Sequence, residues 1–104
     1  PRAARIGRAM SSAAARRLSR LLGDPPGAPL PASAALTARV RADPAAVAEG
    51  LVAEALASDD VTSAAGALAF VEERLSELAA LLPPDLRSVV GREAEAEMRR
   101  RVPG

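Results

Sequence analysis

The sequence predicts an all-α protein of four to five helices, built as a small helical bundle or a helical hairpin around a coiled-coil-like central helix. No stretch alternates apolar and polar residues over the length of a strand. Of the 104 residues, 26 are alanine, the residue with the highest helix propensity. Proline and glycine separate segments whose apolar residues recur every three or four positions, as on one face of a helix.

The N-terminal part, residues 1–22, is expected to be a basic helical arm. Its apolar residues are spaced to keep one helix face apolar, while arginines gather on the opposite side. Gly23 follows as a residue that readily ends a helix. Residues 23–32, rich in proline and glycine, are expected to form a stiff, extended linker. The apolar face consists of Ile6, Met10, Ala14, Leu18, Leu21 and Leu22.

Residues 33–104 are predicted to form an alanine-rich acidic helical module. Asp43 and Pro44 read as the N-cap and first residue of a helix, and Pro84 fits the first turn of the last one. The expected helices cover residues 33–42, 44–57, 61–82 and 84–101. The positions expected to be buried in the first, second and last of them are Leu36, Val40, Val47, Leu51, Val52, Ala55, Leu86, Val90, Ala94 and Met98.

The segment 61–82 has the strongest periodicity in the chain. Its apolar residues alternate at spacings of three and four and fill the a and d positions of three heptads. Such a pattern is typical of a helix packed lengthwise on another helix, and it makes this seam the candidate protein interface. Phe70, the single aromatic residue, lies off the seam, where it would cap the core or face a partner. The seam residues are Val61, Ala64, Leu68, Val71, Leu75, Leu78 and Leu82.

Charge is segregated along the chain although the net charge is only +1. Residues 1–41 carry eight arginines and one acid, residues 42–98 carry three arginines and twelve acids, and residues 99–104 carry three arginines. Charge blocks of this kind mark interaction segments or solvated faces. The candidate contacts to phosphate or to an acidic partner are Arg2, Arg5, Arg16, Arg17 and Arg20. All basic residues are arginine, a bias that a GC-rich genome also produces.

The residue inventory argues against an enzyme. Histidine, cysteine and lysine are absent, so the usual general bases, covalent nucleophiles and zinc ligands are missing. Glutamates one turn apart, such as Glu73 and Glu77, have no histidine to complete a di-metal site and are expected to form solvated faces. We therefore expect no catalytic residue, no metal, no cofactor and no small-molecule substrate.

The leading hypothesis is a non-catalytic helical module for protein–protein interaction or assembly, self-associating or part of a larger complex. An alternative is a nucleic-acid-associated protein whose arginine-rich helix contacts phosphates without reading sequence. A further alternative is a targeting or membrane-surface helix at the N-terminus. In the plainest alternative, the basic helix packs on the acidic helices or on a partner.

The expected location is intracellular, in the cytoplasm or within a macromolecular assembly, with organellar import as the alternative. No apolar run of eighteen residues occurs, so membrane spanning is not expected. Secretion is not expected either, and without cysteine the chain gives no sign of the redox compartment. No motif in the chain is specific enough to indicate a family.

Overall fold

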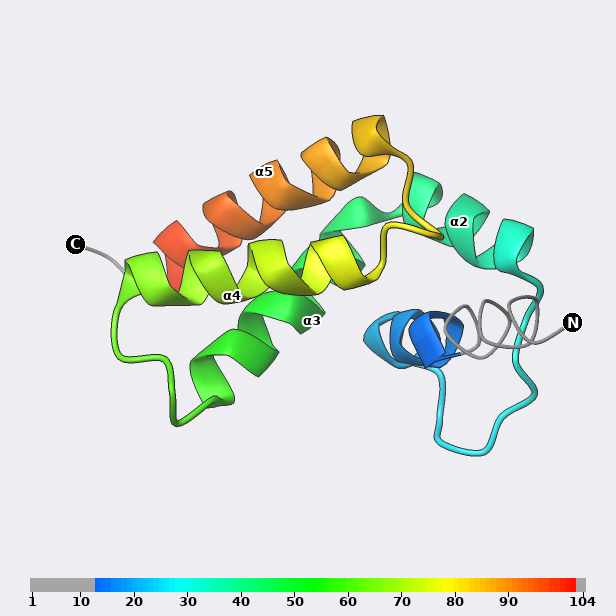
Figure 1. Ribbon diagram of the computed structural model, residues 1–104, viewed down its shortest axis with the longest axis horizontal. Helices are drawn as coiled ribbons and strands as arrows, with labels where there is room; N and C mark the ends of the chain where they lie inside the picture. Colours follow the sequence, from blue (N-terminus) through cyan, green and yellow to red (C-terminus); the bar gives the residue numbers. More distant parts are fainter. Residues whose placement is uncertain (1–12, 103–104) are drawn as a thin grey trace, which may run out of the picture.

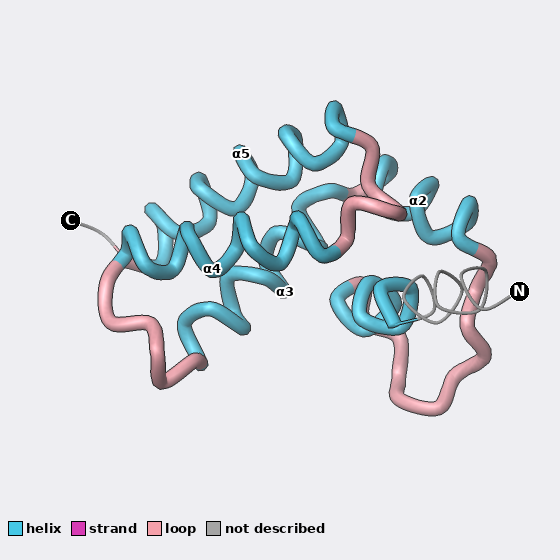
Figure 2. Tube along the Cα trace, in the orientation of Figure 1, coloured by secondary structure: helices cyan, strands magenta, loops and turns pink. Residues whose placement is uncertain are grey.

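The computed structural model describes residues 13–102, and all regular structure within them is helical (Figure 1; Figure 2). Residues 13–21 form a helix, called here the N-terminal helix. The molecule is elongated, with extents of 50 × 28 × 28 Å. The prediction of an all-α fold of four to five helices is confirmed. The other helices are α2 (Ser33–Ala42), α3 (Pro44–Ala57), α4 (Ala64–Glu77) and α5 (Pro84–Arg101).

Helix α3 is the centre of the bundle and packs against α2, α4 and α5, while α4 and α5 also pack on each other. Figure 1 shows α4 and α5 side by side over α3, with α2 at the opposite end from the C-terminus. All ten positions that the sequence assigns to the core of α2, α3 and α5 are buried. Alanines 48, 55, 67 and 94 are among the buried residues, which lets the helices approach closely.

Two helices begin with a side-chain cap. The start of α3 is the one that the sequence predicts, whereas α4 begins at Ala64, three residues after the predicted start at residue 61. The Asp43 carboxylate accepts a hydrogen bond from the Ala46 amide at 3.3 Å, and Pro44 occupies the first turn of α3. The Ser63 hydroxyl accepts from the Gly66 amide at 3.0 Å and caps α4. Such caps satisfy amides that have no partner inside the helix, which fixes the starting residues.

The central helix is shorter than the segment 61–82 that the heptads predict. Helix α4 ends at Glu77, and residues 78–82 form a compact turn with backbone hydrogen bonds such as Leu81 N to Leu78 O at 2.9 Å. Pro83 cannot continue a helix because it lacks an amide hydrogen and its ring clashes with the preceding turn. The turn also buries apolar residues at spacings of three and four, so the periodicity did not distinguish it from a helix.

The candidate interface seam lies mostly inside the chain. Its C-terminal residues pack into the chain's own core, so in this fold they are not accessible to a second subunit. Val71, Leu75, Leu78 and Leu82 are buried, Val61 and Leu68 are half-buried, and Ala64 is exposed.

The N-terminal helix packs on the bundle. Leu18 is fully buried in the common core, which contributes about 1.5–3 kcal/mol for a side chain of this size. The helix ends as expected at Gly23, whose φ of 94° suits glycine. Hydrogen bonds from Gly23 N to Arg20 O at 2.9 Å and from Asp24 N to Ser19 O at 3.1 Å close the last turn in a Schellman arrangement.

The close backbone approach that glycine permits occurs at Gly50, not at Gly66. A Cβ on Gly50 would lie 2.9 Å from Leu21 Cδ2 and 3.4 Å from the Leu21 carbonyl oxygen, so α3 and the N-terminal helix touch there. A Cβ on Gly66 would meet only the capping Ser63 hydroxyl.

Candidate anion-binding cleft

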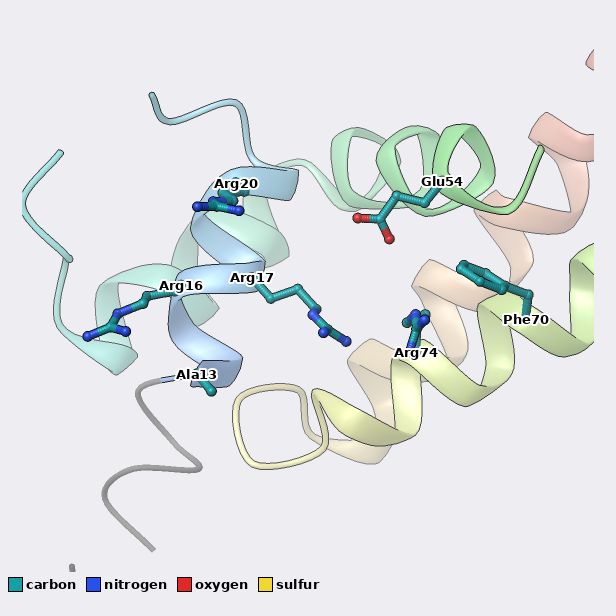
Figure 3. Close-up of a pocket in the computed structure, with 7 residues that line it drawn as sticks. All are labelled: Ala13, Arg16, Arg17, Arg20, Glu54, Phe70 and Arg74. Atoms are coloured by element: carbon teal, nitrogen blue, oxygen red, sulfur yellow. The ribbon is translucent and has the colours of Figure 1, made fainter. Parts of the chain in front are cut away.

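A cleft of about 510 Å³ lies between the N-terminal helix, α3 and α4, and four arginines line it (Figure 3). Arg17 extends from the N-terminal helix toward Arg74 on α4, with Glu54 of α3 and Phe70 of α4 on the facing walls. Arg16 extends away from α4 in the same view. The full lining is Ala13, Arg16, Arg17, Arg20, Glu54, Phe70 and Arg74.

The burial of Leu18 determines which side chains of the N-terminal helix reach the cleft. Ala15 and Leu18, three positions apart, face the core, so Arg16, Arg17 and Arg20 emerge on other sides of the helix. The sequence prediction that these arginines gather apart from the apolar face is consistent with their placement around one cleft. Arg2 and Arg5 lie outside the described residues.

Helix α4 adds a guanidinium on an aromatic ring. The guanidinium carbon of Arg74 lies 4.6 Å from the centroid of the Phe70 ring, a cation–π contact worth about 0.5–1 kcal/mol at an exposed site. The ring orients Arg74 and leaves its remaining donors available. The prediction that Phe70 lies off the seam holds, and it forms part of the cleft wall.

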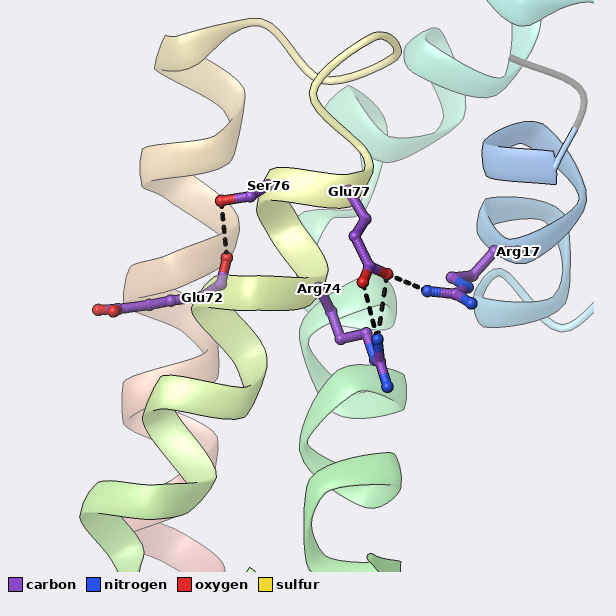
Figure 4. A network of polar contacts seen from close by, with 5 residues as sticks. All are labelled: Arg17, Glu72, Arg74, Ser76 and Glu77. Carbon is purple, nitrogen blue, oxygen red and sulfur yellow. Dashed lines mark hydrogen bonds and ion pairs between the residues drawn. The ribbon is translucent and has the colours of Figure 1, made fainter. Parts of the chain in front are cut away.

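Two of the four guanidinium groups share one carboxylate. Figure 4 shows Arg17 and Arg74 reaching Glu77 from two different helices. Arg74 Nη1 lies 2.9 Å and 3.1 Å from the two Glu77 oxygens, and Arg17 Nη1 donates to Oε2 of the same group. This shared ion pair connects the N-terminal helix to the end of α4. Arg17 and Arg74 therefore already have a carboxylate partner within the chain.

The other two arginines keep their charge available. Within residues 13–102, Arg16 and Arg20 form no ion pair, and both are exposed. The lining therefore carries four positive groups against Glu54, with Glu77 beside them. Arginine presents a planar fork of donors that matches carboxylate and phosphate oxygens. The geometry suits binding of an anionic group.

A second polar network anchors the start of the linker. The Asp24 carboxylate accepts hydrogen bonds from Arg39 Nη1 at 2.8 Å, from Arg39 Nη2 at 3.0 Å and from the Ser19 hydroxyl at 2.6 Å. The Arg39 guanidinium, followed by the Ser19 hydroxyl, lowers the pKa of Asp24 to about 2. Ser19 is buried and engaged here, so modifying it would require the N-terminal helix to detach.

Among the described residues, no three carboxylates gather closely enough to hold a metal ion. Glu97 accepts from Arg100 at 2.5 Å and from Arg101 at 2.6 Å, and these contacts lower its pKa. Two ion pairs on α5 join residues one turn apart, Glu95 with Arg99 and Glu97 with Arg101.

Sequence reasoning missed Arg74 and Glu54 as site residues. They come from α4 and α3, and their meeting with the N-terminal helix depends on how the helices pack, which periodicity does not encode. A local signal existed for Arg74, because Phe70 precedes it by one helical turn and Glu77 follows it by three residues.

Comparisons of the chain with protein-family models, with curated proteins and with solved structures give no match. In the part of the chain that the structure describes, no helix combines the length and the apolar character needed to cross a membrane.

Proposed function

We propose that this chain is a non-catalytic helical interaction module that binds an acidic segment of a partner protein in the arginine cleft. The observation that carries the proposal is that four arginines line one cleft, and two of them, Arg16 and Arg20, have no ion pair among the described residues. A short acidic segment supplies carboxylates for the guanidinium groups, and its apolar atoms can pack on Phe70 and Ala13.

The surroundings of the cleft favour a short acidic segment over nucleic acid. Glu54 and Glu77 lie in or beside the cleft, and residues 42–98 carry twelve acids against three arginines. A long phosphate backbone would run along this acidic body and be repelled. Stacking on single strands would require several aromatic side chains, and the chain has one. The experiment must therefore distinguish binding of an acidic protein segment from binding of nucleic acid.

Fluorescence polarisation with a labelled hexaglutamate peptide tests the proposal, with hexaglutamine as the uncharged probe. We expect hexaglutamate to bind and hexaglutamine not to bind. Arg20→Glu should weaken binding about tenfold, because it replaces a charged donor with a repelling group. Arg92→Glu is the matched control, since it makes the same charge change on α5 outside the cleft.

Two results would reject the proposal. One is equal weakening by Arg20→Glu and Arg92→Glu, which would show that only the overall charge matters. The other is preferential binding of a mixed-sequence DNA duplex with a steep loss of affinity as salt rises, which is the behaviour of phosphate contacts. The second result would replace the acidic protein segment by nucleic acid.

A further inference from the structure

A second hollow, called here the α4–α5 groove, lies between the start of α4 and the end of α5. Its volume is about 390 Å³. Helix α4 contributes the exposed Ala64 and the half-buried Leu68, which are the outer members of the heptad seam. The core of the chain buries the C-terminal members, so this outer part is what the seam still offers to another molecule. The groove is lined by Ala64, Leu68, Glu95, Met98, Arg99 and Val102.

Exposed apolar side chains concentrate at this end of the molecule. Val102 is 38% exposed and lines the groove, and Leu56, near the end of α3, is 42% exposed. In Figure 1 the end of α3, the start of α4 and the end of α5 lie together at the same end of the bundle. The third large exposed apolar residue among those described, Leu30, lies in the linker.

The groove has one negative and one positive side chain beside it, so two copies of this surface can be complementary in charge. Glu95 and Arg99 lie one turn apart on α5, with 53% and 81% of their side chains exposed. Their closest N–O distance is 3.9 Å, so the pair is a weak one. If two copies of α5 cross antiparallel about a two-fold axis, Glu95 of each copy faces Arg99 of the other. A surface with one sign of charge would not allow this exchange.

We infer that the α4–α5 groove binds a second copy of this chain in a two-fold dimer. Val102 and Leu68 of each copy fill the apolar part, Ala64 allows the helices to approach closely, and the Glu95 and Arg99 pairs exchange across the axis. The net charge of +1 produces little repulsion between copies. The dimer is independent of the arginine cleft, which involves α3, α4 and the N-terminal helix.

Light scattering and sedimentation equilibrium from micromolar to millimolar concentration test the inference. The mass should rise from 10.6 kDa toward twice that value as concentration increases. Val102→Asp should lower the association constant, because it places a charge in the apolar contact. Leu30→Asp, the matched control in the linker, should leave the constant unchanged.

Charge reversal tests the two-fold arrangement. Arg99→Glu alone, or Glu95→Arg alone, leaves one sign of charge facing itself and should lower the association constant at least about tenfold. The double variant E95R/R99E should restore it, because the two charges have exchanged places. Thermal unfolding monitored by circular dichroism confirms that each variant is folded.

Three outcomes would overturn the inference: a wild-type monomer at every concentration, a dimer that Val102→Asp and Arg99→Glu leave intact, or a double variant that stays as weak as the single ones. Arg20→Glu should leave dimerisation unchanged. Failure of peptide binding would therefore overturn the proposed function of the arginine cleft, and failure of dimerisation would overturn the proposed dimer, each without affecting the other.

Discussion

Glu77 is the residue whose replacement tests the cleft most directly. Its carboxylate pairs with Arg17 and Arg74, so a ligand that uses these two arginines must first displace it. Glu77→Gln removes the charge but keeps the size of the side chain. We expect the variant to bind the hexaglutamate peptide more tightly than the wild type does.

The exposure of the three side chains gives the size of the effect. The side chains of Glu77, Arg17 and Arg74 are 41%, 43% and 30% exposed, so each ion pair is screened by water and is worth about 0.2–1 kcal/mol. Two such pairs amount to about 1 kcal/mol, which corresponds to a gain in affinity of roughly fivefold. The folded chain should lose a similar amount of stability, because the pair between Arg17 and Glu77 also connects the N-terminal helix to α4.

Fluorescence polarisation gives the affinity, and thermal unfolding of the same samples gives the stability. Glu73→Gln is the control, because Glu73 is exposed on the same helix and makes no ion pair among the described residues. It removes the same charge from the acidic body without releasing an arginine. Unchanged or weaker binding by Glu77→Gln, or an equal gain with Glu73→Gln, would refute the role of Glu77 as an internal competitor.

Two further predictions concern stability. Above about pH 4, the free energy of unfolding of the wild type should exceed that of Asp24→Asn. The difference should disappear as pH falls toward 2, because Arg39 lowers the pKa of Asp24 to about 2 and protonation of this carboxylate removes the advantage of the folded state. Urea titrations across this pH range measure the difference, and a difference that does not change with pH would contradict the prediction. Gly91→Ala should stabilise the chain by up to about 1 kcal/mol, because the added Cβ would lie at an ordinary 3.9 Å from the nearest side chain. Gly50→Ala should not give this stabilisation, because its Cβ would lie too close to Leu21. Equal stabilisation by both substitutions would contradict the close contact at Gly50.

Three helix boundaries were predictable because the chain carries a local signal at each of them. Asp43 and Pro44 define the start of α3, Pro84 defines the start of α5, and Gly23 ends the N-terminal helix, all as the sequence indicates. These residues act through caps and fixed dihedral angles, which depend on the nearest neighbours alone. The fold class followed because the elements between these signals have helical periodicity.

The end of α4 and the composition of the cleft depend on contacts that no local signal encodes. The turn after Glu77 receives a hydrogen bond from a distant helix, since the Thr37 hydroxyl donates to the Leu81 carbonyl at 2.7 Å. The arginine cleft likewise joins residues distant in sequence, because Arg17 meets Glu77 sixty positions further along the chain. Periodicity identifies the face that a helix buries, but not the helix that covers it.

The segregation of charge has a structural use that also limits the surface available for binding. Arg17 pairs with Glu77, and Arg41 pairs with Asp85 at 3.2 Å, so arginines of residues 1–41 neutralise two carboxylates of residues 42–98. The C-terminal arginines neutralise two more, Glu95 and Glu97. Only arginines that these ion pairs leave unpaired can pair with a ligand without first breaking a contact within the chain. Arg16 and Arg20 at the cleft are two such arginines. We therefore expect single substitutions at the cleft to change the affinity for a ligand more strongly than equal changes of charge elsewhere on the chain.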